Sequence, residues 1–329
     1  MPKIVRFHEH GNADVLRLED LPESEPGKGE VRLKVEAIGI NRAEVMFREG
    51  MYLETPTLPS RIGYEAAGTV DAVGPDVTGI TPGDRVSTIP SFSMNQYGVY
   101  GESAIVPARA AAAYPDNLSA VEGAAIWMKY MTAYGALIAF GGLTENASVL
   151  ITAASSSVGL AAIQIARSVG ATAVATTRGG DKKAFLLDAG ADHVIVTDEQ
   201  DIGEQARTVT DGKGVDMVFD PISGPFLERV AQAAAPGAMI FQYGALAEQP
   251  TAFPLLDAIG KGLTIRGYTL FEIAADPDRL ARGKRFITDG LSSGALTPVI
   301  DRTFPLDAIA DAHRYMESNR QRGKIVVTV

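Results

Sequence analysis

The middle of the chain alternates short apolar strands with helical stretches, and this regular alternation constrains the fold more than any other feature. We predict strands at residues 149–154, 173–177, 194–196, 215–220, 239–243 and 263–267. Amphipathic helices are predicted at 160–169 and 182–189, and Gly170 and Gly190 follow them as helix stops. Alternation of this kind implies right-handed crossovers and a parallel sheet that is covered on both faces. The middle of the chain is therefore predicted to be a doubly wound α/β domain that binds a nucleotide.

The two ends of the chain have a different pattern. Residues 31–37 alternate apolar and charged side chains, which is typical of a strand with one buried face. Further short strands are predicted at 68–73, 84–88 and 103–106, and turn signals between them indicate a compact barrel-like domain. The final run, 324–329, is too apolar to remain exposed, so we expect it to join the first domain as a strand. The predicted domains are 1–124, an inserted nucleotide-binding domain over 125–267, and a return to the first domain over 268–329.

Composition and charge exclude several classes of protein. The 329 residues correspond to about two domains. With 30 Lys and Arg against 40 Asp and Glu, the formal charge of −10 argues against a nucleic-acid partner. The chain has no cysteine, which excludes disulfides, thiolate catalysis, iron–sulfur clusters and Cys-ligated zinc. No run approaches the length of about 20 apolar residues that a membrane span requires, and residues 1–8 lack an apolar signal core, so we expect a cytoplasmic protein without a membrane partner.

The sharpest local signal is the turn between the first strand and the first helix of the middle domain. Its residues are Ser155, Ser156, Ser157, Val158 and Gly159. Such a turn directs backbone N–H groups and the positive end of the helix dipole outward, where a pyrophosphate binds well. Serines replace two of the usual glycines, and only Gly159 remains at the close-packing position. Taken alone, the turn is equally compatible with a plain strand–turn–helix connection.

Two cations follow this turn. Arg178 lies 178 − 159 = 19 residues after Gly159, at the end of the next strand, and Lys182 lies one turn into the next helix. A site specific for NAD normally has Asp or Glu at the first of these positions, whereas cations there pair with a 2′-phosphate. The alternative is two ordinary surface cations. Because cations oppose the dipole at a helix N-terminus, we favour the phosphate and predict NADPH as the cofactor.

Several segments together carry a resemblance to a known family. They are residues 39–44, 63–68, 82–86, 131–135, 155–159, 190–195 and 323–326. The chain resembles the medium-chain dehydrogenase/reductases, and within them the zinc-free quinone-oxidoreductase-like branch, along essentially its whole length. The resemblance implies a GroES-like β-barrel catalytic domain built from both chain ends, with a Rossmann domain inserted between them.

The resemblance also implies chemistry without a metal. Zinc-dependent members of the superfamily carry Cys where this chain has Asn41 and His where it has Tyr64. Zinc polarises a carbonyl, and without it the substrate must already be electrophilic at carbon. The implied substrate is a small electrophile, either a quinone or a C=C bond conjugated to a carbonyl. Hydride from NADPH would attack it while hydrogen-bond donors hold the developing oxyanion.

The same resemblance implies the residues of the site. Asn41 and Tyr52 are the expected catalytic residues, with Asn41 near the nicotinamide and the substrate. Tyr52 matches the proton donor of related enoyl reductases, and the alternative, an aromatic residue that only shapes the pocket, stays open. The implied cofactor contacts outside the turn and its two cations are Asn41, Thr132, Tyr243, Gly244, Leu246 and Lys324.

Two other functions remain open at this point. An enoyl-thioester reductase acting on CoA or carrier-protein substrates would need a basic entrance for the pantetheine phosphates. A non-catalytic NADPH-binding protein would serve as a sensor or a structural component. For the assembly, the resemblance suggests a homodimer formed through the edge of the Rossmann sheet.

Overall fold

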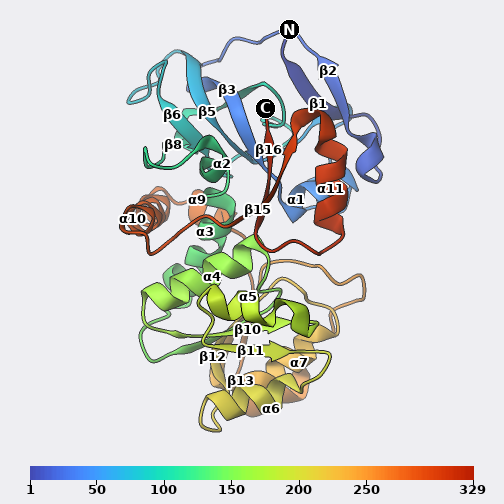
Figure 1. Cartoon of the computed structure of the whole chain (residues 1–329), viewed down its shortest axis with the longest axis vertical. Helices are drawn as coiled ribbons and strands as arrows, with labels where there is room; N and C mark the ends of the chain where they lie inside the picture. Colours follow the sequence, from blue (N-terminus) through green and yellow to red (C-terminus); the bar gives the residue numbers. More distant parts are fainter. The chain divides into compact units, whose positions relative to one another are not determined.

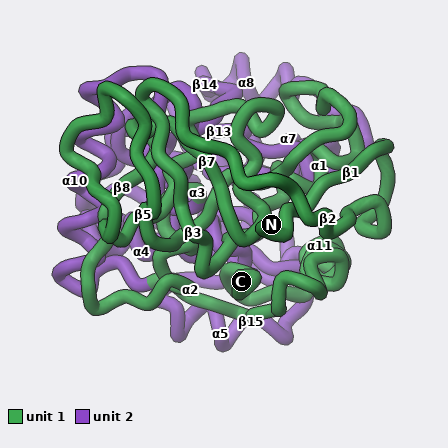
Figure 2. The backbone as a smooth tube through the Cα atoms, turned by 90° about the horizontal axis from the view of Figure 1, so that it is seen from above, with its two compact units in different colours: residues 1–128, 298–329 green, residues 129–297 purple.

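The computed structural model describes all residues 1–329, and the chain divides into two compact units (Figure 1; Figure 2). The first unit consists of residues 1–128 and 298–329, and the second consists of residues 129–297. One unit is thus inserted into the sequence of the other. The predicted insertion of a middle domain into a domain built from both chain ends is confirmed.

The second unit contains a sheet of six parallel strands. In spatial order they are β11 (His193–Val196), β10 (Thr172–Thr177), β9 (Ser148–Ile151), β12 (Val215–Asp220), β13 (Ala234–Gln242) and β14 (Thr264–Gly267). The chain moves outward from β9 in one direction and then restarts beside β9 in the other, as in dinucleotide-binding sheets. All six predicted strands are present. The first ends at Ile151 rather than at residue 154, because Ala153 has a φ of +46° and already belongs to the turn.

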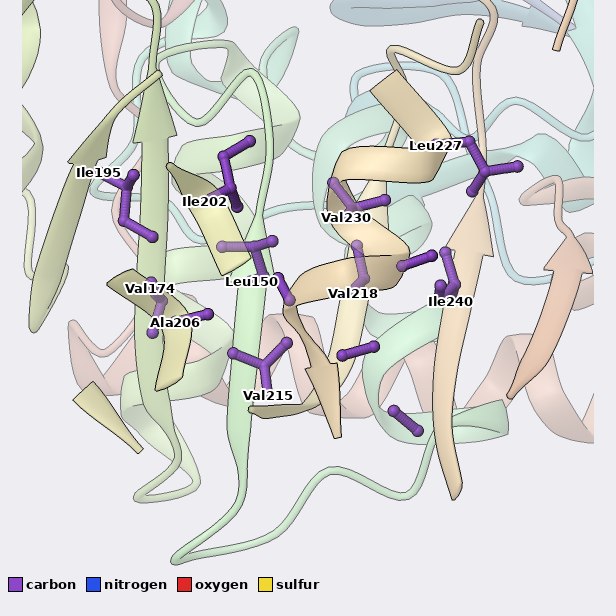
Figure 3. Close-up of a cluster of buried hydrophobic side chains, with 14 residues drawn as sticks. Leu150, Val174, Ile195, Ile202, Ala206, Val215, Val218, Leu227, Val230 and Ile240 are labelled. Atoms are coloured by element: carbon purple, nitrogen blue, oxygen red, sulfur yellow. The ribbon is translucent and has the colours of Figure 1, made fainter. Parts of the chain in front are cut away.

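Helices precede, connect and follow these strands along the chain. They are α3 (Trp127–Tyr134), the π-helix Gly135–Phe140, α4 (Ser157–Ser168), α5 (Lys183–Asp188), α6 (Ile202–Val209), α7 (Phe226–Ala233), α8 (Leu255–Lys261), α9 (Phe271–Ala274) and α10 (Pro277–Ser293). Helices α6 and α7 pack on the sheet through a cluster of buried aliphatic side chains (Figure 3). Ile202 and Val230 from the helices meet Leu150, Val218 and Ile240 from the strands. This burial of apolar surface fixes the sheet on which the strand ends are mounted.

The second unit extends further along the chain than predicted. We expected the boundary after its last strand, at residue 267, but α9 and α10 also belong to it, up to residue 297. Helix α10 packs closely against α3. A Cβ added to Gly283 of α10 would lie only 2.7 Å from the sulfur of Met131 on α3. The rings of Tyr134 and Phe286 lie 5.1 Å apart in the same contact. This packing is tertiary, so strand–helix alternation gives no sign of it.

The first unit is built mainly from antiparallel strands. A seven-stranded sheet contains β15 (Ile300–Pro305), β16 (Lys324–Thr328), β3 (Glu30–Gly39), β5 (Glu65–Val73), β6 (Arg85–Thr88), β8 (Ala111–Ala113) and, beside β3, β7 (Ser103–Pro107). A smaller sheet contains β2 (Arg17–Asp20), β1 (Lys3–Phe7) and β4 (Ser60–Arg61). The helices are α1 (Arg42–Arg48), α2 (Ala120–Gly123) and α11 (Ile309–Glu317).

The last strand closes this unit. Strand β16 pairs antiparallel with β3, with Val326 opposite Gly39 and Thr328 opposite Ala37. The prediction that the C-terminal run returns to the first domain is therefore confirmed. None of the helices in the structure combines the length and the apolar character needed to cross a membrane.

Candidate active site

In the first unit, Asn41 lies at the junction between β3 and α1. Its backbone N–H donates to Glu44 Oε2 at 2.6 Å, so the glutamate one turn into α1 caps the start of the helix. The side-chain Nδ2 of Asn41 donates to Glu44 Oε1 at 3.1 Å and to the carbonyl of Gly39 at 3.2 Å. Glu44 also accepts the N–H of Tyr64 at 3.2 Å. Helix α1 therefore begins in a dense network that is shielded from solvent.

Lys324 approaches this network from β16. Its ammonium donates to Asn41 Oδ1 at 2.5 Å and forms an ion pair with Glu65. The side chains of Lys324 and Glu65 are 0% and 1% exposed, so the pair is fully buried. The charged end of Lys324 thus contacts Asn41 and Glu65, and the expectation that Lys324 reaches the cofactor from the C-terminal strand stays a prediction. We call Asn41, Glu44, Glu65 and Lys324 the buried charge cluster.

The hydrogen bonds of Asn41 determine what its amide has left to offer. An ammonium only donates hydrogen bonds, so the amide oxygen, rather than the nitrogen, faces Lys324. Both N–H groups of the amide are already used, on Gly39 and Glu44. The oxygen retains one lone pair. Asn41 is therefore available as a hydrogen-bond acceptor, and it is not the donor that would hold an oxyanion.

Burial also changes how Glu44 titrates. Removal from water raises the pKa of Glu44 to about 7, and the nearby charge of Glu65 acts in the same direction. Lys324 and the hydrogen bond from Asn41 oppose this rise. The cluster contains two carboxyl groups and one ammonium, so a proton on Glu44 makes it electrically neutral. Below pH 7 we therefore expect Glu44 to be predominantly protonated.

Tyr52 lies in the loop that follows α1, in the same unit. Its ring centroid is 6.3 Å from that of Tyr64, whose hydroxyl donates to Glu54 Oε1 at 3.3 Å. Burial raises the pKa of Tyr52 to about 12 and raises that of Tyr64 further. Both phenols therefore keep their protons at neutral pH, and Tyr52 can serve as a hydrogen-bond donor. The neighbours Met51 and Leu53 are 65% and 73% exposed, which gives the loop an apolar surface beside Tyr52.

In the second unit, the predicted phosphate-binding turn has the expected geometry. Helix α4 begins at Ser157, and the Oγ of Ser156 caps it by accepting the N–H of Gly159 at 3.1 Å. A Cβ on Gly159 would lie 2.5 Å from the carbonyl oxygen of Ala154, so only glycine fits there. Val158 follows in the first turn of the same helix. The backbone N–H groups of this turn are the anion-binding donors of a helix N-terminus.

The structure brings one of the two predicted cations to this turn. Lys182 Nζ donates to Ser155 Oγ at 3.1 Å, although 27 residues separate them in sequence. Arg178 directly follows β10, is exposed, and forms no ion pair or hydrogen bond through its guanidinium. Asp and Glu side chains are absent from this position after β10. The turn therefore combines helix-terminal N–H groups with the positive charge of Lys182, and Arg178 follows the neighbouring strand β10. This arrangement suits a ligand that has more than one phosphate.

The loop after β13 contains three more predicted residues. The ring of Tyr243 stacks on Phe219 at a centroid distance of 4.0 Å. The N–H of Leu246 donates to Pro221 at 3.0 Å, and the carbonyl of Gly244 accepts from Ser223 Oγ at 2.8 Å. This loop is thus fixed against the loop after β12. Thr132, the remaining predicted contact, lies on α3 and is buried.

Sequence analysis did not single out the acidic residues that organise these two regions. Glu44 and Glu65 build the buried charge cluster. Asp220 accepts hydrogen bonds from Thr152 Oγ1, the N–H of Ser223 and Gln242 Nε2, at the ends of three adjacent strands. A usable signal exists for both Glu65 and Asp220, since Glu65 begins a run of small residues and Asp220 ends an apolar strand. No group of three or more His, Cys, Asp or Glu side chains is arranged to hold a metal ion.

Glu44 should make the stability of the protein depend on pH. Its folded-state pKa of about 7 lies above the ordinary value of 4.5, so its stabilising contribution is complete below pH 4.5 and is lost as the pH rises through 7. The change amounts to about 3 kcal/mol in the free energy of unfolding. In urea unfolding at pH 5, 6, 7 and 8, Glu44→Gln should remove this loss. Glu122→Gln, at the equivalent capping position of α2, should retain it. Parallel pH curves for wild type and Glu44→Gln would contradict the assignment.

Comparisons with known proteins agree with the geometry of both units. An alcohol dehydrogenase GroES-like domain family matches residues 27–116, and a zinc-binding dehydrogenase family matches residues 157–282. A 2-haloacrylate reductase from a Burkholderia species is 31% identical, covering 98% of this chain and 97% of its own length. Human quinone oxidoreductase is 30% identical, covering 99% of this chain and 97% of its own.

A solved structure shows the same fold along the whole chain. Escherichia coli quinone oxidoreductase complexed with NADPH superposes with a TM-score of 0.93 at 28% identity, covering 99% of this chain and 100% of its own. The resemblance inferred from the sequence motifs is thereby confirmed. The chain belongs to the medium-chain dehydrogenase/reductase superfamily, in its quinone oxidoreductase-like branch.

Proposed function

We propose that this protein is an NADPH-dependent oxidoreductase that transfers hydride, without zinc, to quinones or to the activated C=C bond of α,β-unsaturated carbonyls. The observation that carries the proposal is the phosphate-binding turn. Lys182 contacts Ser155, and the guanidinium of Arg178 is exposed without a protein partner. A 2′-phosphate is the group that distinguishes NADPH from NADH, and two cations beside a pyrophosphate site fit it. The NADPH complex of the Escherichia coli enzyme and the names of the relatives support the same cofactor and reaction class.

Zinc independence is supported by the available donor atoms. The chain has no cysteine. Where zinc enzymes have ligands, the amide nitrogen of Asn41 is committed to Gly39 and Glu44, and the phenol of Tyr64 is committed to Glu54. The match to the zinc-binding dehydrogenase family covers residues 157–282 and includes neither of these positions. The word zinc in that description therefore characterises the family and not the residues of this chain.

The residues divide the chemical work between the two units. NADPH supplies the hydride when it is bound. The turn 155–159 is proposed to bind its pyrophosphate, Arg178 and Lys182 its 2′-phosphate, and Thr132, Tyr243, Gly244 and Leu246 to line its path. Asn41 offers one acceptor lone pair to the nicotinamide end, and Lys324 contributes through Asn41. Tyr52 is proposed to donate a hydrogen bond to the oxygen of the electrophile or, with an enone, its proton to the α-carbon of the enolate.

The acidity of Tyr52 favours one of the two substrate classes. A phenol with a pKa of about 12 is a weak acid, so it gives its proton only to a strong base. An enolate protonated at carbon is a stronger base than a hydroquinone anion. The proton step is therefore better matched to an α,β-unsaturated carbonyl than to a quinone. With a quinone, Tyr52 is proposed to act as a hydrogen-bond donor only.

We also propose a cytoplasmic homodimer with no nucleic-acid or membrane partner. Strand β14 is the edge of the six-stranded sheet. Helix α8, which precedes it, exposes Leu255, Leu256 and Ile259 at 55%, 85% and 72%. Covering this apolar face with a second copy would remove both the unpaired strand edge and the exposed leucines from water. The lack of disulfide-forming residues fits a reducing compartment, and sedimentation of the purified protein measures the mass of the assembly.

The reaction is tested by NADPH oxidation with metal-stripped protein under anaerobic conditions. We expect turnover of both a quinone and a cyclic enone, with a saturated ketone as the product from the enone. Loss of activity on chelation, restored by zinc, would contradict the proposed metal independence. Turnover restricted to an enoyl thioester would favour the thioester reductase, and tight NADPH binding with no substrate consumed would favour a non-catalytic NADPH-binding protein.

The 2′-phosphate assignment predicts a selective loss of affinity in Arg178→Glu. Removing a charged hydrogen bond and adding a repulsive carboxylate should weaken NADPH roughly 10- to 100-fold, while NADH binding changes little. Fluorescence titration with both dinucleotides measures this selectivity. Lys183→Glu is the matched control, because it makes the same charge change on a nearby exposed cation. Equal losses for NADPH and NADH would overturn the assignment.

The role of Tyr52 is tested by removing only its hydroxyl. Tyr52→Phe should lower kcat with the cyclic enone by roughly 100-fold or more, because the proton donor is lost. The effect on the quinone should be smaller, since only a hydrogen bond is removed there. Tyr97→Phe removes a phenol that donates to Glu30 at 2.7 Å and should leave turnover unchanged. Unchanged enone turnover in Tyr52→Phe would reduce Tyr52 to a residue that shapes the pocket.

A further inference from the structure

We propose that the buried Lys324–Glu65 ion pair is a positioning device for the nicotinamide end of the cofactor, and that it acts by holding the amide of Asn41 as a hydrogen-bond acceptor. The inference rests on the proposed function, because the ligand that meets Asn41 is the proposed cofactor. In this inference Lys324 acts on the cofactor indirectly, through Asn41, and not by the direct contact expected from the sequence. Lys324 and Glu65 are therefore positioning residues.

Stability alone gives no reason for this ion pair. Taking an ammonium and a carboxylate out of water costs several kcal/mol per ion, and apolar replacements of similar size are often neutral or stabilising. Lys324 and Glu65 are nevertheless buried at 0% and 1% exposure, and a second carboxyl group, Glu44, is buried beside them. The charges instead orient neighbouring groups, because each charge binds one particular hydrogen-bonding atom of a neighbour.

The group that these charges orient is the side-chain amide of Asn41. Lys324 binds the amide oxygen at 2.5 Å, while Glu44 and the carbonyl of Gly39 bind the nitrogen. Without the ammonium, the amide is held from the nitrogen side only, by Glu44 and Gly39, and the oxygen loses its fixed position. A flipped amide would present N–H groups where an acceptor is needed. The nicotinamide nucleoside carries ribose hydroxyls and a carboxamide N–H, so an acceptor is the complementary group.

The backbone around the pair is shaped to admit it. A Cβ on Gly39 would lie 2.8 Å from Cε of Lys324 and 2.0 Å from the carbonyl oxygen of Ala124. Only glycine therefore allows β16 and α2 to approach β3 this closely. The lysine stem passes through the space that a side chain at position 39 would occupy.

The pair is also tied to both places where the chain leaves the first unit. Glu65 Oε1 accepts the N–H of Met128 at 2.8 Å, and Met128 is the last residue before the chain enters the second unit. The N–H of Lys324 donates to the carbonyl of Val299 at 2.9 Å, one residue after Pro298, where the chain returns. The acceptor on Asn41 is thus fixed in the same network as both crossovers.

A double-mutant cycle on cofactor affinity tests the inference. Asn41→Ala, Lys324→Met and the double variant are titrated with NADPH and with 2′-phospho-ADP-ribose, which lacks the nicotinamide. Each single change should weaken NADPH about tenfold, the cost of one hydrogen bond, and the double variant should be no weaker than the singles. Binding of 2′-phospho-ADP-ribose should be unchanged throughout, a selectivity that a general loss of structure does not produce.

Two further variants keep the test decisive if Lys324→Met folds poorly. Lys324→Arg retains a donor and should restore most of the NADPH affinity. Combining Lys324→Met with Glu65→Gln removes both charges of the ion pair. This double variant should still lose the part of the NADPH affinity that depends on the nicotinamide. Arg48→Met is the matched control, since Arg48 is another fully buried cation of this unit that pairs with Glu317 and does not contact Asn41. It should lower stability without selectivity for the nicotinamide end.

Two results would overturn the inference. In the first, Lys324→Met weakens NADPH binding as much in the Asn41→Ala background as in the wild type, and Lys324 then acts independently of Asn41. Alternatively, NADPH and 2′-phospho-ADP-ribose could weaken equally, and the effect would then be structural. Failure of the wild type to bind NADPH at all would instead reject the proposed function, so the two failures are distinguishable.

Discussion

The antiparallel pairing of β16 with β3 is the contact on which the first unit depends. It joins the end of the chain to a strand near its beginning, with Val326 opposite Gly39. A unit closed in this way stays incomplete until the last residues are available, because its contacts span almost the whole sequence. The same pairing brings Lys324 to Asn41. One strand pair thus determines both the closure of the unit and the composition of its candidate site.

The two units use electrostatics in opposite ways. In the first unit, charges are buried and act over hydrogen-bond distances on one amide, at a cost in desolvation. In the second unit, Lys182 contacts Ser155 ahead of α4 and Arg178 is exposed after β10, and their charges are proposed to act on phosphates of the ligand. The formal charge of −10 for the whole chain describes neither region. Recognition of a phosphorylated cofactor depends on the local arrangement of charge, and an acidic protein can provide it.

Membership of a superfamily does not fix the chemistry of its members. Where zinc-dependent members of the superfamily carry zinc ligands, this chain has Asn41 and Tyr64. Both side chains already bind other partners within the first unit. Asn41 is bound by Lys324 and Glu44, and Tyr64 by Glu54. The fold is common to these enzymes, whereas the reaction follows from the side chains that occupy a few positions.

The sequence by itself determined the parallel sheet, the turn that leads into α4 and the return of the C-terminal strand. These features depend on patterns that repeat locally, namely strand–helix alternation, a turn before a helix start, and an apolar run too long to expose. Tertiary structure alone decided three other features. Helix α10 joins the second unit through contacts with α3, the charged end of Lys324 contacts Asn41 and Glu65, and Glu44 becomes a buried acid with a raised pKa. Each of these depends on which distant segment lies next to a side chain, and neither spacing nor composition records that. Sequence periodicity reflects which face of a segment is exposed to solvent. The orientation of a buried charged side chain depends on partners that come together only in the folded chain.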